Sequence, residues 1–147
     1  MVYINTKLGE LSMKIVYTGT VKGRGREILE SIKKHMPEGN AGDIVSISTQ
    51  SGQTMFFDFL SVSLGKVSDY TVHLKLYAAP DADYYDAPRK LVVNGADAVV
   101  LVGDPDRNVL EHNTKLISSL SGYIEENLPG TPIVYQWDFS SSESSED

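Results

Sequence analysis

KIVYTGTVKGRGREI, residues 14–28, is the stretch that decides the fold: an apolar run, a glycine-rich loop and the beginning of a helix. The same succession cradles a phosphate in known phosphate-binding loops, where the loop amides and the helix dipole both point at the anion. The chemistry of such a loop also requires a lysine followed by a hydroxyl residue, G-x-x-x-x-G-K-[ST]. Counting from Gly19, the last three places hold Arg24, Gly25 and Arg26. The frame of the loop is therefore present without its reactive side chains.

Length and composition are those of one globular domain. The chain has 147 residues, of which 41% are hydrophobic and 22% are charged. Its net charge of −7 argues against a nucleic-acid partner, because phosphate contacts need a basic surface. The absence of cysteine excludes a disulfide scaffold and cysteine catalysis. No stretch approaches the ~18 apolar residues of a membrane span, so we expect a cytoplasmic protein without one.

Apolar periodicity divides the chain into strands and helices. Residues 2–5 and 10–18 flank a short connection and predict an N-terminal β-hairpin. Residues 54–64 and 70–77 predict a second antiparallel pair, and the continuous apolar run 98–103 predicts a strand covered on both faces. The remaining predicted elements are strands at 43–48 and 132–137 and helices at 24–36, 87–92 and 104–128.

Helices that alternate with buried strands predict an α/β fold with a mostly parallel sheet. The domain is expected to cover residues 1–139. Residues 140–147, SSSESSED, form an acidic, serine-rich segment of low complexity that is expected to be a disordered tail.

Basic residues gather on the first predicted helix and its loop, where five of the chain's 13 lysines and arginines lie: Lys22, Arg24, Arg26, Lys33 and Lys34. Two interpretations remain open, a solvated helix face or a retained anion site. The three histidines, His35, His73 and His112, lack the spacing of metal ligands. No nucleophile–base pair is visible either, so the residues predict neither a metal site nor a catalytic site.

Four stretches resemble small Ras-like GTPases of the bacterial MglA type, the switch of gliding motility and cell polarity. They are KIVYTG (14–19), TMFFDFL (54–60), LYAAP followed by YYDAPRKLVVNGADAVVLVGD (76–80 and 84–104), and PIVYQW (132–137). Matches in this order and spacing are more specific than a lone glycine-rich loop. The resemblance implies a Ras-like P-loop fold: a three-layer α/β/α sandwich whose mostly parallel sheet has one antiparallel strand and an N-terminal β-hairpin, and which lacks the last strand and helix.

The residues that perform the chemistry in that family are replaced in this sequence. Gly25 and Arg26 stand where the family has the lysine that neutralises the phosphates and the Ser/Thr that ligates Mg²⁺. Ala82 takes the place of the glutamine that orients water, and Gln53 that of an intrinsic arginine. The guanine-reading [NT]-K-x-D motif, expected after residues 132–137, is absent.

Two sets of residues are candidates for binding. The degenerate loop would hold any nucleotide through Gly19, Lys22, Gly23, Gly25 and Arg26. A switch-like partner surface would comprise Thr54, Phe56, Asp58, Asp81, Tyr84 and Tyr85. Thr54 and Asp58 match family positions near the switch and the metal; the alternative is a strand-entry threonine and an outward carboxylate. Tyr84 and Tyr85, beside Phe56 and Phe57, form either a contact surface or ordinary half-buried packing.

The resemblance and the departures together predict a catalytically dead pseudo-GTPase, not an enzyme and without a cofactor. It would act as a protein–protein interaction or regulatory module in bacterial polarity or motility. The implied partners are a roadblock-domain regulator of the MglB type, an MglA-type GTPase, or a second copy of the chain. The alternative is a weak, non-canonical guanine-nucleotide-binding protein that takes GTP or GDP with Mg²⁺.

Overall fold

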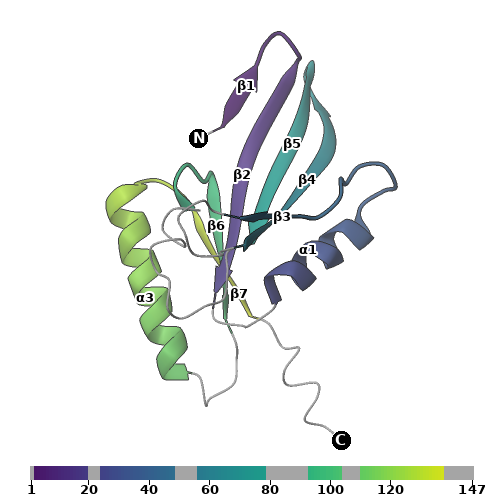
Figure 1. Cartoon of the computed structure of the whole chain (residues 1–147). Coiled ribbons are helices and arrows are strands. Elements are labelled where there is room, and N and C mark those ends of the chain that lie inside the picture. The colour runs from purple at the N-terminus through teal and green to yellow at the C-terminus, as the bar shows by residue number, and fades with distance from the viewer. Residues whose placement is uncertain (1, 20–23, 49–55, 79–92, 104–109, 138–147) are drawn as a thin grey trace, which may run out of the picture.

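In this computed structural model the described residues are 2–19, 24–48, 56–78, 93–103 and 110–137, and they form one seven-stranded sheet with a helix on each face (Figure 1). The strands are β1 (Tyr3–Asn5), β2 (Glu10–Gly19), β3 (Val45–Ser48), β4 (Phe56–Val67), β5 (Tyr70–Ala78), β6 (Ala98–Gly103) and β7 (Ile133–Trp137). The helices are α1 (Arg24–His35) and α3 (Leu110–Asn127).

The strand order of the sheet is β3-β4-β5-β2-β6-β7, with β1 paired to β2 outside this path. β2 is parallel to β5 and β6, and β6 is parallel to β7. β4 runs antiparallel to both β3 and β5 and is therefore the one antiparallel strand of the main path. The predicted mixed sheet and the N-terminal hairpin are confirmed.

Two apolar clusters lie on opposite faces of the sheet. Val16 of β2 and Leu120 of α3 belong to one cluster, and both are almost fully buried. The chain neighbours of Val16, Ile15 and Tyr17, pack against the other cluster, which contains Leu29 of α1. Because successive residues of a strand point to opposite faces, α1 and α3 cover opposite faces. The three-layer arrangement of a Ras-like fold is thereby confirmed.

The burial patterns expected from periodicity are also present. In β6, residues 99–102 are at most 8% exposed, as expected for a strand covered on both faces. In β5, Val72 and Leu76 are buried, whereas Lys75 is exposed and Tyr77 is only partly buried. That strand has one apolar face and one wetter face, as its alternation predicts.

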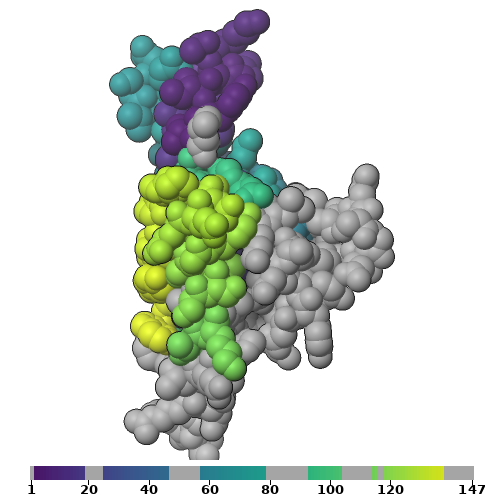
Figure 2. Space-filling model, turned by 90° about the vertical axis from the view of Figure 1, so that its left-hand side faces the viewer, coloured from purple at the N-terminus to yellow at the C-terminus, as the bar shows by residue number. Residues whose placement is uncertain are grey.

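The N-terminal hairpin and the joined ends of β4 and β5 project beyond α3 (Figure 2). Side-chain chemistry shapes the turn of the hairpin: Asn5 Oδ1 accepts hydrogen bonds from the amides of Lys7 and Leu8. Gly9 then takes a left-handed φ of 64°, and its carbonyl accepts a 2.8 Å bond from the Thr71 amide. The tip of the hairpin is thus tied to the start of β5.

The predicted end of the strand 54–64 is wrong, and the connection to the strand 70–77 is shorter than expected. β4 continues to Val67, and a register shift between Ser63 and Gly65 marks a β-bulge. Gly65 supplies the positive φ of 96° that a bulge of this kind accommodates, rather than beginning a turn. Only Ser68 and Asp69 form the turn. The predicted helix at 87–92 and the tail at 140–147 lie outside the described residues, and the last helix is described from Leu110.

Ser68→Gly is expected to stabilise the protein. Ser68 has φ 55°, and it is the only non-glycine residue with a positive φ in the described part of the chain. It occupies the first central position of the two-residue turn, where glycine is favoured. Relief of the left-handed strain, offset by the entropy of glycine, should raise the free energy of unfolding by about 0.5 kcal/mol. Urea denaturation measures the change. Asp69→Gly, at the second position, should destabilise instead, and equal effects of the two substitutions would contradict the assignment.

Candidate functional site

The carboxyl ends of β2 and β6 lie side by side at the centre of the sheet. The two strands are parallel neighbours, and Gly19 is opposite Val102, the residue before Gly103. α1 follows β2 on one face and α3 follows β6 on the other, so the two connections diverge at this point. Open α/β sheets bind ligands outside the carboxyl ends of their strands at such a point. Gly19 therefore ends β2 at the kind of position where such sheets bind ligands.

The N-terminus of α1 directs its first backbone amides toward this region, and amides at a helix N-terminus have no partner within the helix itself. The helix has Glu27 in its first turn and Lys33, Lys34 and His35 in its last turn, a distribution that complements the helix dipole. Arg24 and Arg26 are the exceptions, because a cation in the first turn is disfavoured by about 0.3–1 kcal/mol. For Arg26, two nearby carboxylates offset this cost.

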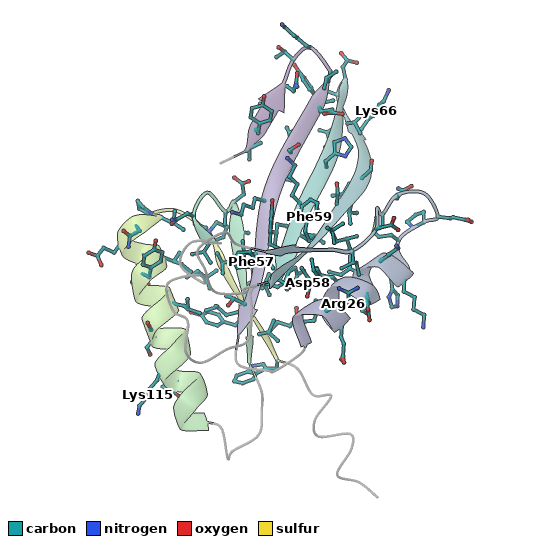
Figure 3. All side chains as sticks on the ribbon, viewed as in Figure 1. Arg26, Phe57, Asp58, Phe59, Lys66 and Lys115 are labelled. Carbon is teal, nitrogen blue, oxygen red and sulfur yellow. The ribbon has the colours of Figure 1, made fainter. Side chains whose placement is uncertain are left out.

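Arg26 is joined to Asp58 and Ser46 at this end of α1, and Figure 3 shows Arg26 directed toward Asp58. Arg26 Nη1 lies 3.2 Å from Asp58 Oδ1 and 3.3 Å from Ser46 Oγ. Ser46 Oγ also donates a 2.8 Å hydrogen bond to Asp58 Oδ1. Ser46 and Asp58 face each other because they are register partners in the β3–β4 ladder. Arg26 Nε is in addition 3.4 Å from Glu30 one turn along the helix.

Thr18, one residue before Gly19, has a hydroxyl with no hydrogen-bond partner, and the residue is only 3% exposed. A buried hydroxyl left unpaired costs about 1–3 kcal/mol. Within the described part of the chain it is the one buried side-chain polar atom in this condition. Thr18 is the penultimate residue of β2, and a ligand or water bound there would satisfy its hydroxyl.

The structure brings together two of the predicted site residues, Arg26 and Asp58. Gly25 precedes Arg26 in the first turn of α1, and Gly19 ends β2. The other predicted residues, Lys22, Gly23, Thr54, Asp81, Tyr84 and Tyr85, lie outside the described residues, and for Phe56 only the backbone in β4 is described. Phe57 is 7% exposed and belongs to the core cluster on the α3 face, so it is a packing residue rather than part of a contact surface.

The basic residues of α1 fit neither of the two interpretations, a solvated helix face or a retained anion site, completely. Arg26 and Lys33 have side chains 48% and 40% exposed, as on a solvated face. Each is nevertheless paired with a carboxylate from outside α1, Arg26 with Asp58 of β4 and Lys33 with Asp43 before β3, at 3.3 Å. The pairing of Arg26 was not predicted, because its partner is 32 residues away in sequence.

Lys14 and Asp97 form a second polar cluster that sequence reasoning missed. The Lys14 amide donates a 2.8 Å hydrogen bond to Asp97 Oδ2, and the Asp97 amide donates one of 2.7 Å to the Lys14 carbonyl. Lys14 Nζ bonds the Asn94 carbonyl at 2.8 Å and lies 5.0 Å from the centre of the Tyr77 ring. Burial lowers the pKa of Lys14, and the charge of Asp97 partly opposes this. In the sequence, the signal that could have indicated this cluster is the position of Lys14 at the start of an apolar run.

The described residues do not fit a divalent metal at Asp58. Mg²⁺ takes oxygen ligands at about 2.1 Å in a near-octahedral set. Asp58 Oδ1 already accepts bonds from Ser46 and from Arg26, whose guanidinium has donors only and cannot be a ligand. In the portion of the chain that the structure describes, no group of three His, Cys, Asp or Glu side chains is placed to hold a metal.

Among the described residues no helix is long and apolar enough to cross a membrane.

No protein-family model matches the chain. It is 34% identical over 140 residues to the protein called "Mutual gliding-motility protein MglA" of Myxococcus xanthus (strain DK1622). The match covers 93% of this chain and 72% of that protein. The similarity therefore extends over nearly the whole chain rather than the glycine-rich loop alone.

Proposed function

We propose a function from the premise that the chain belongs to the MglA family of small Ras-like GTPases. The chain binds a guanine nucleotide at the carboxyl edge of the sheet, between the end of β2 and the N-terminus of α1. The bound nucleotide regulates its contact with a protein partner in the cytoplasm. The process served is bacterial gliding motility or cell polarity.

Two predictions from the sequence are wrong. The replaced loop residues predicted a protein that is not an enzyme and that takes no cofactor. Membership of a family of GTPases, which bind GTP or GDP with Mg²⁺, contradicts both. The physical reason lies in the chemistry: phosphoryl transfer depends on positioning and on charge stabilisation spread over several groups. The replacement of the familiar side chains, Gly25 for the lysine among them, is therefore not by itself proof that activity is lost.

The position of the α1 N-terminus supports the nucleotide proposal most directly. It follows the central strand β2 at the switch point of the sheet, where its amides and dipole favour an anion. The buried, unpaired hydroxyl of Thr18 lies at the same end of β2. Arg26 adds a half-exposed guanidinium, the side chain best suited to phosphate.

The partner is proposed to contact the switch-like surface beside β4, that is Thr54, Phe56, Asp58, Asp81, Tyr84 and Tyr85. A roadblock-domain regulator of the MglB type or an MglA-type GTPase fits the family. Self-association has separate support at the other side of the sheet. There, β7 pairs only with β6 within the described residues, and Val134, Tyr135 and Trp137 are each more than half exposed. An open strand edge with apolar side chains favours pairing with another chain.

Titration of the purified protein with fluorescent GDP and GTP tests the nucleotide proposal. The fluorescence of Trp137, the chain's one tryptophan, provides a second signal. Its ring lies against Gly103 at the carboxyl end of β6, so closely that a Cβ added to Gly103 would be 3.2 Å from Cζ3 of the ring. Saturable binding is expected for GDP and GTP. Hydrolysis of GTP should be slow, because intrinsic turnover of Ras-like proteins is slow without a partner.

Gly25→Asp places a carboxylate in the first turn of α1 and should weaken nucleotide binding by about tenfold or more, because it repels the phosphates. Ser31→Asp introduces the same charge on an exposed position of the same helix and serves as the matched control. Absence of saturable binding, or equal effects of the two substitutions, would overturn the nucleotide proposal. A separate pull-down with the MglB-type regulator tests the partner.

A further inference from the structure

We infer that the Arg26 guanidinium takes the place of the divalent cation at Asp58, so that this chain binds its phosphate-bearing ligand without Mg²⁺. The inference rests on the proposed function and deepens it. Arg26 stands at the position where the family's loop has its metal-binding hydroxyl, and the guanidinium lies 3.2 Å from Asp58 Oδ1. One substitution thus both removes a metal ligand and brings a positive charge to the carboxylate.

The cluster is built around this charge. Asp58 is the less exposed member, with its side chain 22% exposed against 48% for Arg26. Its Oδ1 accepts one bond from Arg26 Nη1 and a second from Ser46 Oγ, whose position is fixed by the β3–β4 register. Hydrogen bonds between charged groups of this kind are stronger than neutral ones. The carboxylate is therefore neutralised by a group that is covalently part of α1.

A divalent cation at this place would meet a guanidinium as well as a carboxylate. Seen from a distance, the positive charge of Arg26 cancels the negative charge of Asp58. The cation therefore loses the attraction that Asp58 alone would exert on it. Displacement of Arg26 from Asp58 would also cost free energy. Asp58 would lose its charged partner and keep only a neutral one, the Ser46 hydroxyl. Exclusion of the metal follows from the arrangement of these three side chains.

Arg26 is at the same time placed to serve a phosphate. Its contacts with described residues engage Nη1 and Nε, whereas a guanidinium has five N–H donors in a planar fork. About half of the side chain is accessible, and it projects from the first turn of α1, where the helix dipole also favours an anion. A tethered guanidinium supplies positive charge beside a phosphate in the way that arginine does in other phosphate sites.

The binding of fluorescent GDP is measured with excess Mg²⁺ and again with EDTA, for the wild-type protein and for Arg26→Thr. The wild-type affinity is expected to be the same in both conditions. Arg26→Thr restores the family's hydroxyl, and its affinity should be about tenfold or more higher with Mg²⁺ than with EDTA. Arg26→Lys keeps the charge and should remain independent of Mg²⁺. Lys33→Thr is the matched control, because it removes one positive charge and one ion pair from the other end of the same helix.

A metal-binding measurement without nucleotide separates the inference from the proposed function. Mn²⁺ is titrated into the wild-type and Arg26→Thr proteins, and the broadening of the backbone NMR signals of Ser46 and Asp58 is followed. Broadening in the variant alone supports the inference. Broadening in the wild type, or in neither protein, overturns it, because Arg26 would then not be what keeps a cation away.

The two measurements fail in distinguishable ways. Wild-type binding of GDP that requires Mg²⁺ overturns the inference and leaves the proposed function intact. Absence of GDP binding in every condition overturns the proposed function, and the Mn²⁺ titration then decides the role of Arg26 by itself. Circular dichroism of each variant establishes that it is folded.

Discussion

Leu29→Ala is expected to lower the free energy of unfolding by about 2–5 kcal/mol, the range for truncation of a buried leucine. Leu29 is completely buried and is the residue by which α1 enters the cluster formed by Leu60, Val62, Leu76 and Ala78 of the sheet. Truncation removes apolar contacts and leaves a cavity between the helix and β4. Urea unfolding followed by circular dichroism measures the loss.

The same substitution should weaken the site, since Leu29 lies one helical turn after Arg26 and fixes the helix that presents the guanidinium to Asp58. Ser31→Ala, on an exposed position of α1, is the matched control and should change stability by less than about 0.5 kcal/mol. A loss below about 1 kcal/mol for Leu29→Ala would show that α1 is not held by this contact.

Asp97→Ala is expected to cost about 2–3 kcal/mol, because it leaves a partly buried amide without its acceptor. The carboxylate accepts the 2.8 Å bond from the Lys14 amide, and it is the negative charge that raises the pKa of Lys14 against the effect of burial. Its loss therefore exposes the full burial penalty of the Lys14 ammonium. Thermal and urea unfolding at neutral pH measure the effect.

The pH dependence of this variant follows from the sign of the Lys14 shift. A lysine whose pKa is lower in the folded state is a destabilising group while it is protonated. Stability therefore rises as the pH increases through that lowered pKa toward the ordinary lysine pKa of 10.5. The deficit of Asp97→Ala relative to wild type should therefore become smaller in alkaline solution. Asp97→Asn keeps an oxygen acceptor and should lose less at neutral pH. An equal loss for both substitutions at every pH would contradict this account.

The family and most of the fold were predictable because they depend on local signals. The apolar run of β6 indicates a strand covered on both faces, and this is confirmed. The end predicted for the strand 54–64 was wrong because a glycine such as Gly65 signals a positive φ without distinguishing a bulge from a turn. The absence of familiar loop residues was read as absence of cofactor and activity, and family membership contradicts that conclusion.

The sequence by itself determined the order of strands and helices, the faces that they bury and the family to which the chain belongs. These follow from periodicity and from motifs, which are contained in short stretches of chain. Only the tertiary structure decided that Arg26 meets Asp58 and Ser46, and that Lys14 meets Asp97 from 83 residues away. Such pairs depend on the register of strands and the rotation of a helix over the sheet, which are fixed by packing of the whole core and not by any local pattern.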